Sequence, residues 1–204
     1  MPLNPLFLLF LQLLIFIISI INAFCIMEKV QVLDKTFRIY IPAAEIAKRV
    51  GEIAQELSRD YAGKNPLFLA VLNGAFMFSS DLFKCVDIPA EISFVKVASY
   101  EGTDTTGSVS ELIGLNEDIE GRHVVILEDI IDTGGSMFSL LKTLEAKKPA
   151  SVAIASLLLK PEKLQHPIKV DYCGFKIPND FVVGYGMDYD RFGRNLPDLY
   201  VLSK

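Results

Sequence analysis

Residues 124–136 read Val-Val-Ile-Leu-Glu-Asp-Ile-Ile-Asp-Thr-Gly-Gly-Ser. The four apolar residues predict a buried strand, with the acids Glu128 and Asp129 at its carboxyl end. Asp132 then opens a Thr-Gly-Gly-Ser turn, which leads into a helix expected over residues 137–147. Ligands of open α/β sheets bind outside the carboxyl ends of strands, and a glycine-rich turn entering a helix offers free backbone N–H groups to a phosphate. The stretch therefore predicts a site for a sugar phosphate.

Three other interpretations of this stretch explain fewer of its residues. Asp132-Thr133-Gly134 matches the triplet of an aspartic protease, but that site needs two such acids and no second Asp-Thr-Gly occurs in the sequence. A dinucleotide site would require Gly-x-Gly-x-x-Gly after the strand, which is missing. An ordinary strand–turn–helix with solvated acids leaves Glu128 and Asp129 unexplained beside so apolar a strand.

Strands and helices alternate along the rest of the sequence. Residues 42–60 carry apolar side chains at three- and four-residue spacings, which predicts an amphipathic helix with Pro42 in its first turn. Residues 67–72 are continuously apolar, as expected of a buried parallel strand. The alternation predicts an α/β fold with helices on both faces of a parallel sheet. The other expected strands are 30–40 (a pair around Asp34-Lys35), 92–99, 151–159, 171–175, 181–183 and 199–202, with a further helix at 76–85.

The composition suits one globular domain with a sizeable core, because 51% of the 204 residues are hydrophobic and 22% are charged. The formal net charge of −5 argues against non-specific binding of nucleic acid. Three cysteines without metal-ligand spacing predict reduced thiols and a cytoplasmic location. The two histidines, His123 and His166, are too few and too far apart for a histidine-rich metal site.

Residues 1–26 differ from the rest of the sequence, because they carry no charge and residues 6–21 are almost wholly Leu, Ile and Phe. Such a segment is typical of a signal-peptide core or a short membrane anchor. Its amino end lacks Lys and Arg, and no Ala-x-Ala cleavage site follows. We therefore expect translation to begin at Met27, with an anchor as the alternative. The expected division is a hydrophobic extension at 1–26 and a domain at 27–204, without membrane contact unless the extension is retained.

The string at 124–136 resembles the binding motif for 5-phosphoribosyl 1-pyrophosphate (PRPP) of the type I phosphoribosyltransferases, and it matches at every position class. Further segments narrow the resemblance to the hypoxanthine–guanine phosphoribosyltransferases of purine salvage. The resemblance covers nearly everything after Met27. It implies a central parallel sheet flanked by helices, with a small hood formed by the N-terminal and C-terminal segments. The further segments are Leu72-Asn73-Gly74, Ser99-Tyr100, Lys160, residues 181–189 and Arg194.

The resemblance implies a role for each polar residue of the motif. Asp132 would be the catalytic base that takes the proton from N7 of the purine. Glu128 and Asp129 would hold the 2′- and 3′-hydroxyls of the ribose, directly or through metal-bound water. The residues that would bind the 5′-phosphate are Thr133, Gly134, Gly135 and Ser136.

Two of the further segments would bind pyrophosphate and close the site. Asn73 and Gly74 would lie in a pyrophosphate loop that contains a cis peptide, and Arg194 would bind pyrophosphate oxygens. Some relatives carry lysine at the position of Asn73, so backbone donors would contribute more of the binding here. Ser99 and Tyr100 would begin a mobile lid formed by the polar stretch 100–110, which would exclude water during the reaction.

The remaining segments would recognise the purine and a magnesium ion. Lys160 would donate to the 6-oxo group, which would select 6-oxopurines over adenine. The base would stack on Phe181 and pair with backbone groups of Val182, and Asp188 would lie near the base edge. The residues that would hold Mg²⁺ are Glu128, Asp129 and Asp188.

Together these roles imply an enzyme that transfers 5-phosphoribosyl from PRPP to hypoxanthine, and to guanine, with release of pyrophosphate. Its partners would be these small molecules, and relatives imply a homodimer or homotetramer. Two alternatives share the fold: a regulator that senses PRPP, and an enzyme acting on a pyrimidine or xanthine. The acidic charge and the intact catalytic acid disfavour the regulator. Lys160 together with residues 181–188 favours a 6-oxopurine.

Overall fold

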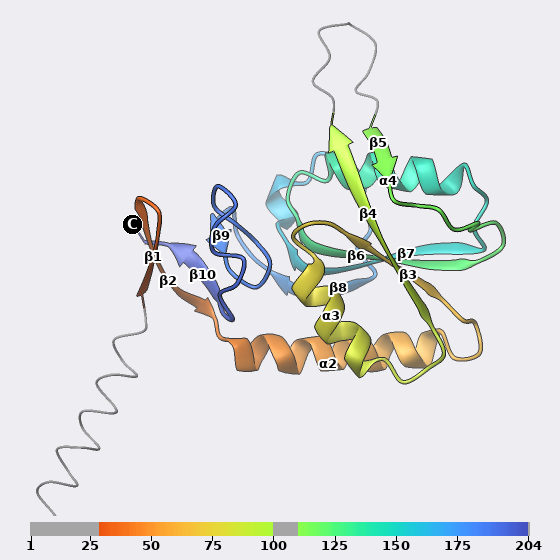
Figure 1. Ribbon diagram of the computed structural model, residues 1–204, viewed down its shortest axis with the longest axis horizontal. Coiled ribbons are helices and arrows are strands. Elements are labelled where there is room, and N and C mark those ends of the chain that lie inside the picture. The colour runs from red at the N-terminus through yellow and green to blue at the C-terminus, as the bar shows by residue number, and fades with distance from the viewer. Residues whose placement is uncertain (1–28, 100–109, 204) are drawn as a thin grey trace, which may run out of the picture.

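The computed structural model describes residues 29–99 and 110–203. These residues form a six-stranded sheet flanked by helices, with a separate four-stranded sheet at one end (Figure 1). The order of the larger sheet is β5-β4-β3-β6-β7-β8, and every neighbouring pair from β4 to β8 is parallel. The predicted parallel sheet is therefore confirmed. Its strands are β3 (Leu67–Val71), β4 (Glu91–Ser99), β5 (Ser110–Ile113), β6 (His123–Ile131), β7 (Ser151–Leu159) and β8 (Tyr172–Lys176).

Strand β5 is the one element of this sheet that was not predicted. It pairs antiparallel with β4 and forms one edge of the sheet. Its sequence, Ser-Glu-Leu-Ile, has no strong strand pattern, so pairing with β4 decides its conformation more than local propensity does.

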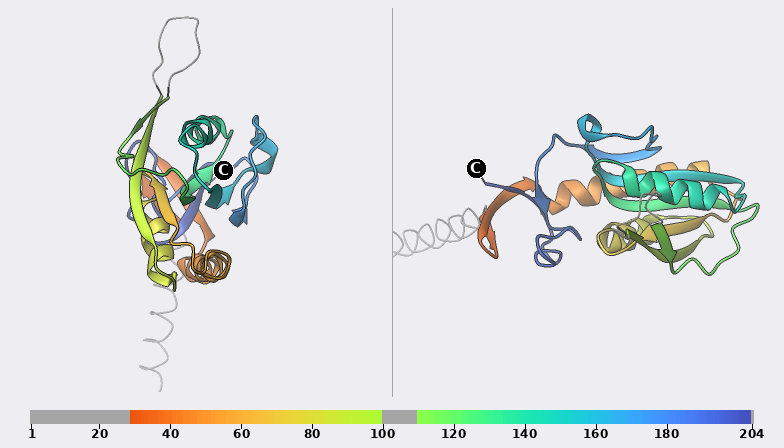
Figure 2. Two further views of the ribbon diagram at one scale, coloured as in Figure 1. Left: turned by 90° about the vertical axis from the view of Figure 1, so that its right-hand side faces the viewer. Right: turned by 90° about the horizontal axis from the view of Figure 1, so that it is seen from above.

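Different helices cover the two faces of the larger sheet (Figure 2). Helices α2 (Ala43–Asp60) and α3 (Phe76–Cys85) pack on one face, and α4 (Gly135–Glu145) packs on the other. The predictions for the first two helices are confirmed, with Pro42 as the N-cap of α2. Helix α4 begins and ends two residues earlier than predicted. The apolar positions that predicted α2 are all buried: Ile46, Val50, Ile53, Ala54 and Leu57.

Strand β6 is buried on both faces. Val125 and Leu127 pack in the core beneath α2 and α3, whereas Val124 and Ile126 pack in the core beneath α4. The acids Glu128 and Asp129 lie near the carboxyl end of the strand, as expected, and parallel pairing with β7 continues two residues beyond them to Ile131.

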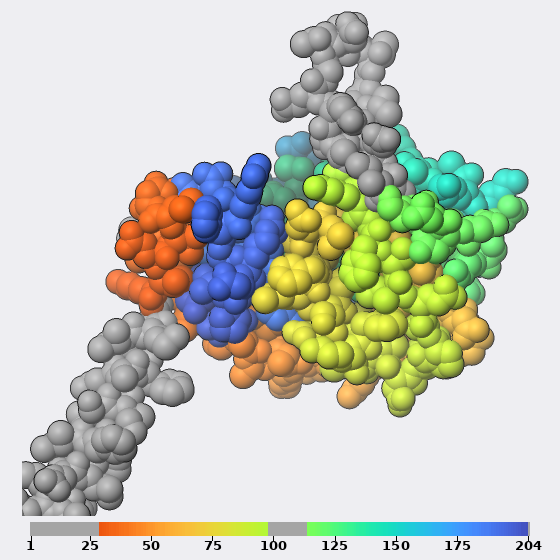
Figure 3. Space-filling view, viewed as in Figure 1, coloured from red at the N-terminus to blue at the C-terminus, as the bar shows by residue number. Residues whose placement is uncertain are grey.

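The smaller sheet confirms the predicted hood, because it joins the N-terminal and C-terminal parts of the described chain. Its antiparallel order is β1-β2-β10-β9, and its own core includes Phe37 and Tyr200. We call these strands and the connection over residues 184–198 the hood. Figure 3 shows the hood at one end, against the body around α3. The strands are β1 (Lys29–Val32), β2 (Lys35–Ile41), β9 (Val182–Val183) and β10 (Leu199–Leu202).

The predicted N-terminal extension lies outside the described residues, so the boundary at Met27 stays a prediction. Within residues 29–99 and 110–203, no helix combines the length and apolarity needed to cross a membrane.

Candidate active site

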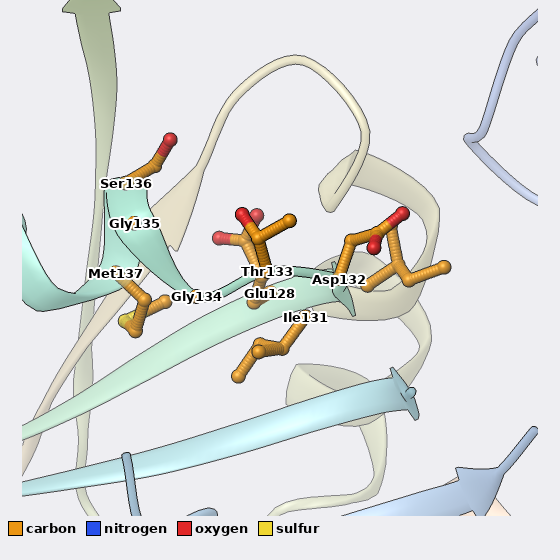
Figure 4. Close-up of a pocket in the computed structure, with 9 residues that line it drawn as sticks. Glu128, Ile131, Asp132, Thr133, Gly134, Gly135, Ser136 and Met137 are labelled. Atoms are coloured by element: carbon orange, nitrogen blue, oxygen red, sulfur yellow. The ribbon is translucent and has the colours of Figure 1, made fainter. Parts of the chain in front are cut away.

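The turn between β6 and α4 forms a pocket of about 140 Å³, which we call the turn pocket. Gly134 has a φ of 84°, and no side chain within the described part of the chain caps the amino end of α4. The first N–H groups of the helix are thus available to an anionic ligand. Figure 4 shows the Glu128, Thr133 and Ser136 side chains directed to the same side of the turn. All residues predicted to bind the 5′-phosphate line this pocket, together with Glu128 and Asp132.

A second pocket, of about 200 Å³, lies between the sheet and the hood, and we call it the hood pocket. The carboxyl ends of β6 and β7 supply one wall, and the segment around β9 supplies the other. Phe181 is 43% exposed although it is large and apolar, so its ring can stack on a planar ligand. The structure brings all four residues predicted to bind the purine together. The lining consists of Asp129, Ile130, Asp132, Lys160, Phe181, Val182, Met187 and Asp188.

The two adjacent acids of β6 face different pockets. Glu128 lines the turn pocket and Asp129 lines the hood pocket, because neighbouring side chains of a strand point to opposite faces. A Cβ at Gly74 would overlap the Asp129 carboxylate, so this acid lies directly against the loop after β3. Glu128 Oε2 is buried, and it has no hydrogen-bond partner among residues 29–99 and 110–203. A ligand at this edge of the sheet would therefore meet the two acids from opposite sides of the strand.

Both acids are more basic than ordinary carboxylates. Burial raises the pKa of Glu128 well above its usual value, and the nearby charge of Asp129 raises it further. Burial also raises the pKa of Asp129 to about 6, although backbone N–H donors and Arg194 favour its ionised form. Perturbed carboxyl groups that line adjoining pockets are typical of a functional site.

Asp132 borders both pockets. Its Oδ2 accepts a hydrogen bond from Lys160 Nζ at 3.0 Å, and Lys163 Nζ lies 2.8 Å from its Oδ1. Burial alone would raise the pKa of Asp132, but the two ammonium groups outweigh burial and lower it. Asp132 is therefore an ionised carboxylate at neutral pH that can accept a proton from a ligand in either pocket.

The loop after β3 meets the hood through two glycines. The Leu72–Asn73 peptide is cis, as the family resemblance implies. Gly186 has a φ of 99°, and a Cβ there would overlap the carbonyl oxygen of Gly74. Arg194 donates to Gly186 O at 2.7 Å and pairs with Asp188 at 2.5 Å. The predicted pyrophosphate residues of the loop and of the hood are thus brought to one place.

Comparison with known proteins agrees with this geometry. Residues 41–190 match the model of the family described as "Phosphoribosyl transferase domain". The chain belongs to the phosphoribosyltransferase family. The hypoxanthine-guanine-xanthine phosphoribosyltransferase of Tritrichomonas foetus is 39% identical over 179 residues, which are 87% of this chain and 98% of that protein. The hypoxanthine-guanine phosphoribosyltransferase of Streptococcus thermophilus strain CNRZ 1066 is 42% identical over 168 residues, which are 82% of this chain and 93% of that protein.

Solved structures show the same phosphoribosyltransferase fold. The crystal structure of a hypoxanthine phosphoribosyltransferase from Staphylococcus aureus has a TM-score of 0.75 and 37% sequence identity, and it covers 81% of this chain and 91% of that chain. The predicted family and the predicted sheet with its flanking helices are therefore confirmed.

The family resemblance implies Mg²⁺, and the carboxylates of this phosphoribosyltransferase fit that ion. Among the described residues, no three His, Cys, Asp or Glu side chains are grouped as a complete metal site. Mg²⁺ needs no such group, because it binds one or two carboxylates together with substrate phosphates and water. Glu128 Oε2 is buried and unpartnered, and Asp129 and Asp188 share the hood pocket. These oxygen donors suit Mg²⁺ once a phosphorylated substrate completes the set.

The predicted lid falls at the edge of the region that the structure describes. Ser99 is the last residue of β4, and Tyr100 lies outside the described residues. The lid therefore stays a prediction.

Two residues of the site that were not predicted are Met187 and Lys163, besides the apolar lining residues Ile130, Ile131 and Met137. Met187 is buried and lines the hood pocket, and Lys163 pairs with Asp132. Met187 carries no polar signal in the sequence. Lys163 follows Lys160 by three residues, but this spacing alone does not show that a turn directs both lysines to Asp132.

Proposed function

We propose that this chain transfers the 5-phosphoribosyl group of PRPP to hypoxanthine, and to guanine, giving IMP or GMP and pyrophosphate. One observation carries the proposal: Asp132 borders two pockets, one at an uncapped helix N-terminus and one beside half-exposed Phe181 and buried Lys160. A phosphorylated pentose in the first pocket and a planar base in the second would meet at Asp132. The reaction named for the relatives joins ligands of these two kinds.

The turn pocket would bind the sugar phosphate. Backbone N–H groups at the start of α4 and the hydroxyls of Thr133 and Ser136 would donate to the 5′-phosphate. Glu128 and Asp129 would hold the ribose hydroxyls from the two faces of β6. Their negative charge would stabilise the cationic character that develops at the anomeric carbon as the bond to pyrophosphate breaks.

The leaving pyrophosphate would lie between the loop after β3 and the hood. Backbone donors at Asn73 and Gly74 would bind its oxygens, and the forked guanidinium of Arg194 suits the same ligand. Arg194 is already held beside this loop by Gly186 and Asp188. We further propose Mg²⁺ bound by Asp188, Glu128 and Asp129 with substrate oxygens, where it would neutralise charge on the leaving group.

The hood pocket would bind the purine. Its ring would stack on Phe181 and its edge would pair with the backbone of Val182. Lys160 would donate to the 6-oxo group, and Asp132 would take the N7 proton as the new bond forms. Lys160 Nζ already donates to Asp132 Oδ2, and its ammonium group has three N–H donors, so the same lysine would link the 6-oxo group to the catalytic carboxylate.

The test is an assay of the full-length chain with PRPP, Mg²⁺ and radiolabelled bases. We expect nucleotide formation from hypoxanthine and guanine, little from xanthine, and none from adenine or uracil. Conversion of adenine or uracil in place of the 6-oxopurines would overturn the assignment of the base. Binding of PRPP without conversion of any base would point instead to a regulator of the same fold.

We also propose that the catalytic domain spans residues 27–204 and works in the cytoplasm as a homodimer or homotetramer. Cys85 and Cys173 are free thiols, which suits a reducing compartment. Intact mass measurement of the native protein would test the start at Met27, since retention of residues 1–26 would contradict it. Light scattering would test the assembly, and a monomeric mass would exclude it.

A further inference from the structure

The carboxylate of Asp132 lies between two ammonium groups, and only one of them has a role in the proposed reaction. Lys160 Nζ donates to Oδ2 at 3.0 Å, and Lys163 Nζ lies 2.8 Å from Oδ1. The Lys160 side chain is 7% exposed, whereas that of Lys163 is 34% exposed. Each oxygen of the carboxylate therefore has its own lysine, one inside the hood pocket and one nearer the surface.

The backbone explains why two lysines reach one acid. Lys160 is the N-cap of a short 3₁₀ helix, η2 (Pro161–Lys163), with a proline in its first turn. Lys163 is the last residue of this helix, and the turn brings its Nζ to the same carboxylate as that of Lys160. The Lys163 N–H donates to Lys160 O at 3.1 Å, which closes the turn.

This segment is also fixed to the backbone on both sides of Asp132. The Lys160 N–H donates to Ile131 O, and the Gln165 N–H donates to Thr133 O, each at 3.0 Å. The lysine pair therefore cannot shift as a unit without breaking the backbone pairing next to the catalytic acid. Lys163 is placed by the fold rather than by a chance encounter of surface charges.

We propose that Lys163 is a positioning residue, which holds Oδ1 of Asp132 so that Oδ2 faces the purine while Lys160 donates to the 6-oxo group. This inference rests on the proposed function. Lys163 is the one cationic partner of the carboxylate, among the described residues, that has no contact with the purine in the proposed reaction. It fixes the plane of the carboxylate and keeps it ionised until the N7 proton arrives.

The charges around Asp132 give the inference a pH signature. Burial favours the neutral acid, and the two lysines lower its pKa in spite of burial. Without Lys163 the pKa of Asp132 rises toward its ordinary value or above it, so the acidic limb of the rate profile moves to higher pH. The charged groups that face Asp132 are Lys160 and Lys163 directly, Glu128 across the turn pocket, and Asp129 and Asp188 across the hood pocket.

The experiment compares full-length wild type with Lys163→Met and Lys163→Arg in the hypoxanthine assay. We expect Lys163→Met to lower kcat about tenfold, with KM for PRPP within about twofold of wild type. The acidic limb of kcat should move up by about one pH unit, and Lys163→Arg should restore kcat to within about threefold of wild type. Lys169→Met is the matched control, because Lys169 pairs with Asp171 at 2.7 Å in the same segment but is 87% exposed. It should leave kcat and the profile unchanged.

The outcomes of this experiment distinguish failure of the Lys163 role from failure of the proposed function. If the wild type makes no nucleotide, the proposed function fails and the role of Lys163 fails with it. If the wild type is active and Lys163→Met keeps its kcat and its acidic limb, Lys163 positions nothing. A Lys163→Gln variant, measured with thermal melting alongside, replaces the methionine variant if that protein unfolds. Loss of kcat in Lys163→Arg equal to that in Lys163→Met would also overturn the proposed role of charge.

Discussion

The turn pocket and the hood pocket meet at Asp132 but are built in different ways. The turn pocket is lined by Glu128 and residues 130–137, which form one continuous strand, turn and helix start. The hood pocket combines the ends of β6 and β7 with Phe181 and with Val182, Met187 and Asp188 of the hood. The first depends on local backbone geometry, and the second depends on how two parts of the molecule pack. Binding of the sugar phosphate should therefore tolerate disturbance of the hood better than recognition of the base does.

The largest expected loss of activity follows substitution of Asp132, which lines both pockets. Asp132→Asn keeps the shape of both pockets but removes the proton acceptor, so kcat should fall about 10²–10⁴-fold. KM for PRPP should change by less than about threefold, because the turn pocket keeps its N–H donors. Steady-state kinetics with hypoxanthine provide the measurement. A kcat within threefold of wild type would show that the base lies elsewhere.

Two glycine-to-alanine substitutions would compare how tightly the backbone is constrained in the hood and in the turn pocket. Gly186→Ala places a Cβ against the Gly74 carbonyl at a φ of 99°, so it should lower the free energy of unfolding by about 1–3 kcal/mol. Gly135→Ala in the turn pocket meets its nearest atom, His166 Nε2, at 3.7 Å and should change stability by less than about 0.5 kcal/mol. Urea unfolding of both variants provides the measurement. Equal losses would mean that the turn is as tightly constrained as the contact with the hood.

A lysine substitution would test whether the hood pocket sets base choice. Lys160→Ala removes the donor to the 6-oxo group, so kcat/KM for hypoxanthine should fall about tenfold and the preference over adenine should narrow. KM for PRPP should move less, since the turn pocket is intact. Lys176→Ala, at the exposed end of the neighbouring strand β8, is the control. Unchanged selectivity between hypoxanthine and adenine would remove Lys160 from base recognition.

The smallest expected effect concerns stability without substrate. Glu128 is buried, and its pKa is raised by burial and by Asp129. A carboxyl group with a raised pKa stabilises the fold below its ordinary pKa, and this contribution is lost as pH rises through the higher value of the folded state. Glu128→Gln should thus raise the free energy of unfolding at pH 7.5 by about 1 kcal/mol. The free energy of unfolding of the variant should also decrease less than that of the wild type as pH rises. Thermal melting in EDTA from pH 5 to pH 8 would measure this. A lower melting temperature for the variant at pH 7.5 would contradict it.

The difference between the turn pocket, formed by one continuous segment, and the hood pocket, formed by two parts of the molecule, explains what could be predicted from the sequence. The turn pocket was predicted residue by residue, because a strand, an acid and a small turn are adjacent in the chain. The hood pocket was predicted only through a family resemblance, since nothing in the sequence itself places Phe181 beside Lys160. The exact end of β6 was not predicted for a related reason, because pairing with β7 continues the strand two residues beyond the acid pair, to Ile131.

Lys163 and β5 are two further features that could not be predicted from the sequence. A lysine at this spacing is ordinary in a solvated loop, and only the 3₁₀ turn directs it to Asp132. The sequence of β5 carries little strand signal, and its partner β4 decides the pairing. Both depend on tertiary contacts that a single sequence does not display.

The order of strands in the hood has a consequence for a chain that is incomplete at its carboxyl end. Strand β10 lies between β2 and β9, and within residues 29–99 and 110–203 it is the sheet partner that joins β9 to the rest of the hood. Leu199–Leu202 leave the ribosome after all the other strands described here. A chain that lacks Leu199–Leu202 would therefore leave β9, which borders the hood pocket, without this sheet partner.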